Sequence, residues 1–310
     1  MPRKCWPVLS SEFHQKKYSQ TGQDGVLEYI FNNIGATNRY YVEFGYPNVR
    51  FHLSLTLTHS LSLYYIQVKG GKQGSNTENL RLHHNFTGLL MDREYSSESI
   101  NLHKETITAE NIISLFEKYK VPLAPDYVSI DIDSMDLWVF RSVVSSKYRP
   151  RVITVEYNMN YPMNSTLTCA LKCHWTGCRH FGTSIGKTIT YSLTYSLTHS
   201  YCEGALNLVA EEFKYTLVSV LPQTDAFYIR NEELNDSTLI LPSLKYFEDN
   251  FGINYLKRCS IKHGDDGRHF VESNVVDYRA WRVAGNITYA RIKALEQLEI
   301  MRLYQNIEII

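Results

Sequence analysis

A regular alternation of short apolar strands and amphipathic helices restricts the fold of this 310-residue chain more than any other feature. Apolar runs with the length of buried strands occupy 40–45, 88–92, 126–133 and 151–158. Helical spacing of apolar residues is found at 17–34, 75–86, 108–119 and 205–213. Strands that alternate with helices form parallel sheets whose two faces are covered by the helices. The sequence therefore predicts a doubly wound α/β sheet.

The ends of the expected helices carry local signals. Gly35 follows the last apolar position of the first helix and is suited to end it. Ser75 or Asn76 is the expected N-cap of the second helix, because a small polar side chain can accept the free amides of a first turn. The run 286–310 spaces its apolar residues along one face of a long helix. A packing helix or weak coiled coil is favoured there over a membrane-surface helix, since its polar face is mixed in charge.

Two further apolar runs, "YTLVSVL" and "DAFYIRN", are separated by only the three residues 222–224. So short a link predicts an antiparallel hairpin. Dinucleotide-binding dehydrogenase folds do not need a reversed last strand, whereas the methyltransferase sheet has one. The predicted fold is therefore a doubly wound, mostly parallel sheet of the Rossmann-like class I methyltransferase type with a terminal antiparallel hairpin.

Composition and charge exclude several classes of partner. Hydrophobic residues make up 44% of the chain, which is enough for a full globular core, and 32 basic residues balance 32 acidic ones. A chain with this balance has no overall field that favours nucleic acid. No apolar run approaches the roughly 20 residues that span a bilayer, and the N-terminal apolar run is too short for a signal peptide. The expected location is cytoplasmic, and the six cysteines are expected to be mostly free thiols.

Acidic residues close the expected parallel strands, and they are the candidate site. Ligands of open parallel sheets bind beyond the C-terminal ends of the strands. Glu43 and Gly45 close the first strand, and a glycine there lets backbone amides approach a ligand. Asp92 closes the second strand, where a carboxylate can accept both ribose hydroxyls of an adenosine cofactor. The remaining strand-end residues are Asp131, Asp133, Glu156 and Asn158.

The segment "DIDSMD" has the densest negative charge. Alternation along a strand would place Asp131 and Asp133 on one face, where mutual repulsion raises a pKa and suits a general base or a metal site. An equally weighted alternative is that Asp133 or Ser134 only caps the following helix. The motifs "GTSIGKT" and "CALKCHWTGCRH" do not have the spacing of a phosphate loop or a zinc site, so no metal is expected.

The motifs together resemble the FkbM-type methyltransferase-like family, in its eukaryotic branch. The matching segments include "SQTGQDGVLEYIF", "YYVEFG", "SNTENL", "GLLMD", "DYVSIDIDSMDLWVF" and "DAFYIRN", in order, within 15–235. The resemblance implies S-adenosylmethionine as cofactor and O-methylation of an unknown acceptor, a small molecule or a glycan. It implies that Glu43 and Gly45 lie in the first cofactor loop and that Asp92 contacts the ribose. Asp131 and Asp133 would lie beside the transferred methyl group, and one of them is the candidate base.

Two stretches, 49–69 and 185–203, depart from the family pattern, and each contains an uncharged repeat, at 53–63 and at 190–200. Both cycle Ser-Leu-Thr-His, which a tetranucleotide repeat TCAC encodes when it is read through. We interpret them as insertions or gene-model artefacts within a 15–235 methyltransferase-like domain. The remainder, 236–310, is expected to be a partly helical C-terminal extension.

A second interpretation of the same sequence is a catalytically inactive methyltransferase-fold protein that acts as a binding or scaffold module. The first stretch interrupts the loop that should hold the methionine end of the cofactor, which favours this alternative. A nicotinamide-dependent enzyme is disfavoured, because the chain lacks the glycine-rich dinucleotide fingerprint.

Overall fold

The structure of the chain is a computed structural model. It describes residues 15–45, 75–132, 135–157, 165–170, 204–221, 225–234, 269–270, 275–305 and 308–309. Both Ser-Leu-Thr-His stretches, Asp133, Ser134 and Asn158 lie outside the described residues.

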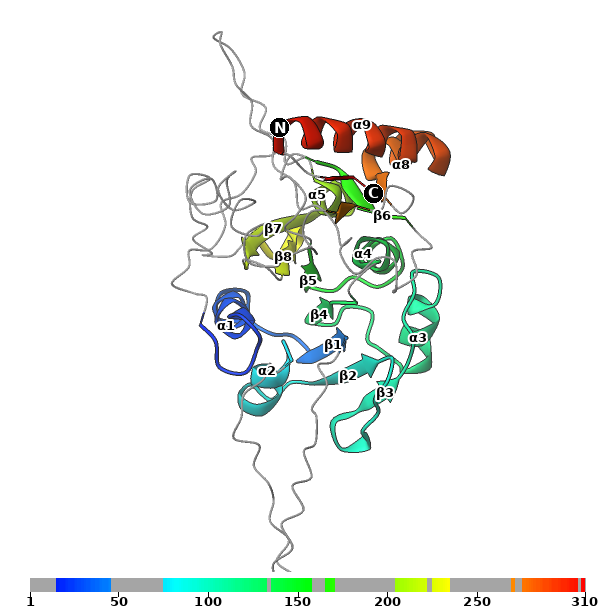
Figure 1. Cartoon of the computed structure of the whole chain (residues 1–310). Helices are drawn as coiled ribbons and strands as arrows, with labels where there is room; N and C mark the ends of the chain where they lie inside the picture. The colour runs from blue at the N-terminus through cyan, green and yellow to red at the C-terminus, as the bar shows by residue number, and fades with distance from the viewer. Residues whose placement is uncertain are drawn as a thin grey trace, which may run out of the picture.

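A seven-stranded sheet in the order β3-β2-β1-β4-β5-β8-β7 forms the centre of the fold (Figure 1). Five of its strands run parallel: β1 (Tyr40–Phe44), β2 (Thr87–Asp92), β3 (Leu102–Lys104), β4 (Tyr127–Ile130) and β5 (Val152–Glu156). The strand β8 (Asp225–Arg230) is antiparallel to β5 and to β7 (Tyr215–Val220). The predicted α/β sheet and its terminal hairpin are thus confirmed, and the arrangement is consistent with a Rossmann-like fold.

Helices cover both faces of this sheet (Figure 1). One face packs against α1 (Gln23–Ile34) and α2 (Glu78–His83), which bury Leu27 and Leu80 with Tyr41 and Tyr127 of the sheet. The other face packs against α3 (Ile112–Lys118), α4 (Asp136–Val144) and α5 (Ala205–Glu212). Strand alternation divides the apolar residues between the two layers, because successive side chains point to opposite faces.

Several expected elements begin later than the apolar pattern predicts. Residues 17–22 precede α1 as a loop, because the Oδ2 of Asp24 accepts the backbone N–H groups of Lys17, Tyr18 and Ser19 at 2.6–2.8 Å. The prediction of a Ser75 or Asn76 cap for α2 is wrong. Its N-cap is Thr77, whose side chain makes no capping hydrogen bond. The strand β3 has no counterpart among the predicted strands, since Leu-His-Lys is too short and too polar to be recognised.

The C-terminal segment adds to the α4 and α5 layer. The strand β10 (Val275–Asp277) pairs with β6 (Leu167–Cys169), and α8 (Tyr278–Ala284) and α9 (Ile287–Gln305) follow it. Tyr278, Ala280 and Ala290 belong to the same core as α4 and α5. Short elements complete the description: β9 (His269–Phe270), β11 (Glu308–Ile309) and the 3-10 turns Glu98–Ile100 and Asn231–Leu234.

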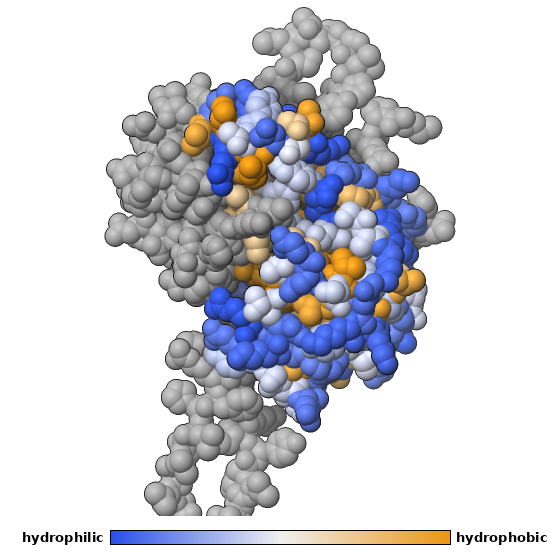
Figure 2. All heavy atoms as spheres, turned by 90° about the vertical axis from the view of Figure 1, so that its right-hand side faces the viewer, coloured by the Kyte–Doolittle hydropathy of each residue, from blue (hydrophilic) through white to orange (hydrophobic). Residues whose placement is uncertain are grey.

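The C-terminal layer bears on two expectations from the sequence, that the cysteines are mostly free thiols and that no segment spans a membrane. Cys169 is disulfide-bonded, so this cysteine is not a free thiol, and the five other cysteines lie outside the described residues. Apolar side chains are exposed over α8 and α9, with Val283 at 83% and Ile292 at 51% exposure (Figure 2). None of the described helices, α9 included, combines the length and the apolarity that crossing a membrane requires.

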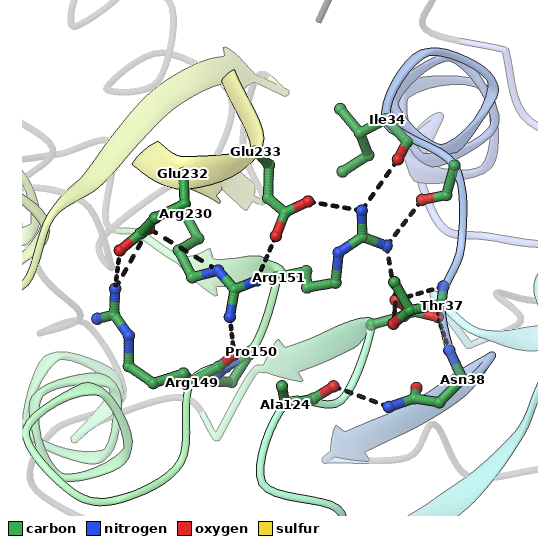
Figure 3. Close-up of polar contacts among 12 residues, drawn as sticks. Ile34, Thr37, Asn38, Ala124, Arg149, Pro150, Arg151, Arg230, Glu232 and Glu233 are labelled. Atoms are coloured by element: carbon green, nitrogen blue, oxygen red, sulfur yellow. Dashed lines mark hydrogen bonds and ion pairs between the residues drawn. The ribbon is translucent and has the colours of Figure 1, made fainter. Parts of the chain in front are cut away.

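The N-terminal edge of the sheet is closed by a buried ion-pair network (Figure 3). Arg151 donates to Asp126 at 2.8 Å, to Glu233 at 2.6 Å and to the carbonyl groups of Ile34 and Gly35 at the end of α1. Burial alone would raise the pKa of Asp126, but the hydrogen bonds from Arg151, Thr37 and the backbone outweigh it and lower that pKa. The carboxylate therefore stays ionised where strands β4 and β5 begin.

Candidate functional site

The strand-end residues predicted from the sequence gather at the C-terminal edge of the parallel sheet. Glu43 and Gly45 lie at the end of β1, between Asp92 at the end of β2 and Asp131 just beyond β4. The chain runs from β1 to β2 on one side and later returns to β4 on the other. This is a topological switch point, where ligands of open α/β sheets bind. The second candidate base, Asp133, lies outside the described residues, so its placement stays a prediction.

Gly45 meets the backbone of Asp131 at this edge. Its φ is +67°, and a Cβ built on it would lie 1.9 Å from the carbonyl oxygen of Asp131. No side chain fits at that distance, so the glycine is required for contact between the two strand ends. The contact places Gly45 directly beside Asp131, the described candidate base.

Glu43 is buried, with 3% of its surface exposed, and holds the start of α2. Its Oε1 accepts the backbone N–H of Asn76 at 2.8 Å. Its Oε2 accepts the backbone N–H of Thr77 at 3.3 Å and also the Thr77 hydroxyl. Glu43, 33 residues before Asn76 in the chain, thus anchors the two residues that precede α2 and does not cap its first turn. Burial raises the pKa of Glu43 to about 7, although these hydrogen bonds lower it in part.

Asp92 shapes the turn after β2 and remains partly exposed. Its Oδ1 accepts the backbone N–H groups of Glu94 at 2.7 Å and Tyr95 at 2.9 Å. From the described residues, Oδ2 accepts no hydrogen bond. The two hydrogen bonds to Oδ1 therefore fix the orientation of the carboxylate, and they leave Oδ2 without a described donor.

Asp225, which sequence reasoning missed, is a second buried carboxylate at the same edge. Only 2% of its surface is exposed, and it begins β8 opposite Glu156. Its Oδ2 accepts from the side-chain amides of Gln23 at 2.7 Å and Asn76 at 3.5 Å. Burial raises its pKa to about 6. The sequence could have indicated Asp225, because the second strand of an antiparallel hairpin begins at the edge where the parallel strands end, and Asp225 is its first residue.

Hydroxyl groups continue this polar cluster across the α1 face of the sheet. Asn76 donates to the Ser129 hydroxyl at 3.0 Å, and Thr154 donates to the same oxygen at 3.1 Å. The Tyr127 and Thr154 hydroxyls are 2.8 Å apart. Strand register aligns Glu43, Ser129 and Thr154 in one row. Within the described part of the chain, no group of three or more His, Cys, Asp or Glu residues is placed to hold a metal ion.

Comparison of the chain with protein-family models, with curated proteins and with solved structures finds no match. A function is therefore inferred from the geometry of this edge of the sheet and from the sequence motifs.

Proposed function

We propose that the chain is an S-adenosylmethionine-dependent methyltransferase that methylates a hydroxyl group of a small-molecule or glycan acceptor. The observation that carries the proposal is the sheet order, in which β1 and β4 are central and β8 alone is reversed. This order is the one expected of the class I methyltransferase type. The resemblance of the motifs to the FkbM-type family supports the same class.

The residues of the C-terminal edge fit an adenosine cofactor. Asp92 has one oxygen fixed by two turn amides, and its second oxygen is suited to accept ribose hydroxyls. The contact of Gly45 with the backbone of Asp131 supports a role for both residues near the methionine end of the cofactor. Glu43 has both oxygens engaged by Asn76 and Thr77, so its contribution is to hold the residues that precede α2 rather than to bind the cofactor itself.

S-adenosylmethionine, when bound, supplies a methyl group that reacts with nucleophiles. The chain's own task is to hold an acceptor hydroxyl in line and to accept its proton. Asp131 follows β4 at this edge and is the described candidate for that base. Asp133 is the other candidate from the sequence.

Transfer of labelled methyl groups tests this proposal. Purified protein would be incubated with S-adenosyl-[methyl-³H]methionine and panels of hydroxyl-bearing small molecules and glycans. We expect label in at least one acceptor and a loss of at least tenfold in Asp131→Asn, as is typical when a general base is removed. Equal transfer by Asp92→Ala and the unaltered chain would argue against the assigned cofactor site.

One observation favours the alternative of an inactive binding module. Twenty-nine residues, 46–74, separate Gly45 from Ser75, where the family resemblance implies a short loop. A chain that binds neither S-adenosylmethionine nor S-adenosylhomocysteine, with or without residues 49–69, would support this second function.

A further inference from the structure

Buried carboxylates at the two edges of the sheet differ in whether a described cation pairs with them. At the N-terminal edge, Asp126 is fully buried and paired with Arg151 (Figure 3). At the C-terminal edge, Glu43 and Asp225 are buried as deeply, yet no described Lys, Arg or His forms an ion pair with either. A buried charge without a partner of opposite sign is costly, so such groups tend to take up a proton.

Asn76 connects these two carboxylates. Its backbone N–H donates to Glu43 at 2.8 Å, and its side-chain amide reaches Asp225 at 3.5 Å and Ser129 at 3.0 Å. Thr77 adds two further hydrogen bonds to Glu43. The short segment 75–77, where the chain enters α2, is therefore fastened to the sheet by Glu43 and Asp225, the two carboxylates that form no ion pair with a described residue.

We propose that the fastening of 75–77 to the sheet is proton-dependent: it closes when the Glu43–Asp225 pair holds a proton and loosens when both carboxylates are ionised. The proposal concerns the protein without any ligand and goes beyond the proposed methyl transfer. According to this proposal, the attachment of residues 75–77 to the sheet, just before α2, depends on pH near neutrality.

The hydrogen bonds around Glu43 can accommodate its neutral form. A protonated Oε2 can donate to the Thr77 hydroxyl, which can in turn donate to the Ser75 hydroxyl 3.2 Å away. The proton comes from solvent, and no other bond has to break. Asp225 keeps its two amide donors meanwhile, although its buried Oδ1 has no hydrogen-bond partner among the described residues. The pair is thus better satisfied with one proton than with none.

Among the described residues, the titratable groups on neighbouring elements supply no positive charge to this pair. On β4, burial and then the charge of Asp225 raise the pKa of Tyr127 well above its usual range, so this phenol stays neutral. On α1, Asp24 is acidic and its Oδ2 is taken up by residues 17–19. On β5, Glu156 lies opposite Asp225 and adds a further acid. The described surroundings of Glu43 and Asp225 therefore favour proton uptake.

The sign of the effect follows from the raised pKa values. Glu43 has a pKa of about 7 in the closed form, against an ordinary value of 4.5 once the segment opens. Stability from this group is fully present below pH 4.5 and is lost as the pH rises through about 7. Between pH 6 and pH 8 the closed form therefore loses about tenfold in its ratio to the open form.

Hydrogen–deuterium exchange followed by mass spectrometry tests the proposal on the full chain without ligand. Protection of the amides of 75–83, corrected for intrinsic exchange rates, would be compared at pH 6 and pH 8. We expect about a tenfold loss of protection at pH 8 in the unaltered chain. Glu43→Gln should remove most of this difference, because its amide can still donate to Thr77 but does not ionise. Asp225→Asn should reduce the difference and leave the segment protected.

Asp126→Asn is the matched control, since it neutralises a buried carboxylate that already has a cation. It should lower protection at both pH values and keep the difference between them. Equal protection at pH 6 and pH 8 in the unaltered chain, or an unchanged difference in Glu43→Gln, would overturn the proposal. If Glu43→Gln does not fold, Asp225→Asn decides instead, and an unchanged difference in protection between pH 6 and pH 8 in that variant would overturn the proposal. Because no cofactor is present, failure here is separate from failure of the methyltransferase assay.

Discussion

Gly45 and the carbonyl oxygen of Asp131 approach so closely that a Cβ on residue 45 would lie 1.9 Å from that oxygen. Gly45→Ala must therefore displace the end of β1 or β4 in addition to straining a φ of +67°. We expect a loss of about 3 kcal/mol or more in the free energy of unfolding. Gly285→Ala is the control, because Gly285 also has a positive φ but nothing lies within 4 Å of its Cβ position. It should cost only about 1–2 kcal/mol in urea unfolding, and equal losses in the two variants would contradict the close contact.

Arg151→Met should be among the most destabilising single substitutions at the N-terminal edge. It leaves the fully buried Asp126 without a cation and removes the link to the end of α1. Breaking a buried pair from one side costs about 3–5 kcal/mol. The matched variant Arg149→Met removes a more exposed pair with Glu232 and one hydrogen bond to the carbonyl of Phe213, and should cost about 1–2 kcal/mol. Urea unfolding at pH 7 measures both, and a smaller loss in Arg151→Met than in Arg149→Met would exclude the assigned network.

Glu43 and Asp126 should give opposite dependences of stability on pH. Glu43 has a raised pKa, so its contribution is lost as the pH rises through about 7, and Glu43→Gln should be more stable than the unaltered chain at pH 8 but not at pH 5. Asp126 has a lowered pKa, so its contribution is present above 3.8 and is lost only as the pH falls further. Asp126→Asn should therefore be less stable at every pH from 5 to 8. Thermal unfolding across this range would show both, and parallel profiles for the two variants would refute the difference between the edges.

Replacing residues 49–69 by a short Gly/Ser linker should leave the fold intact. The described chain on either side is held independently, with Gly45 against Asp131 and Asn76 against Glu43. A flexible loop gains about 0.6 kcal/mol of closure free energy per halving of its length, so the shortened chain should be slightly more stable. Circular dichroism and urea unfolding would check this. A loss of cooperative unfolding would show that the stretch is part of the folded structure.

Local pattern was sufficient for six of the seven strands of the central sheet and for the edge that carries the candidate site. Four apolar runs predicted β1, β2, β4 and β5, and acids at their ends predicted where Glu43 and Asp92 lie. The local pattern could not predict contacts between residues that are far apart in the chain. The hydrogen bond from Asn76 to Glu43 and the Arg151 pair with Asp126 span 33 and 25 residues. Asp225 was overlooked because its strand runs the other way, and β3 because its three residues bury only Leu102.

Isothermal titration with S-adenosylhomocysteine tests the cofactor site most directly. It would be measured on the full chain and on the chain shortened at 49–69, each with an Asp92→Ala counterpart. We predict binding by the shortened chain with a dissociation constant in the micromolar range, weaker binding by the full chain, and a loss of at least tenfold on removing the Asp92 carboxylate. Absence of binding at millimolar ligand by a shortened chain that unfolds cooperatively would contradict the proposed methyltransferase.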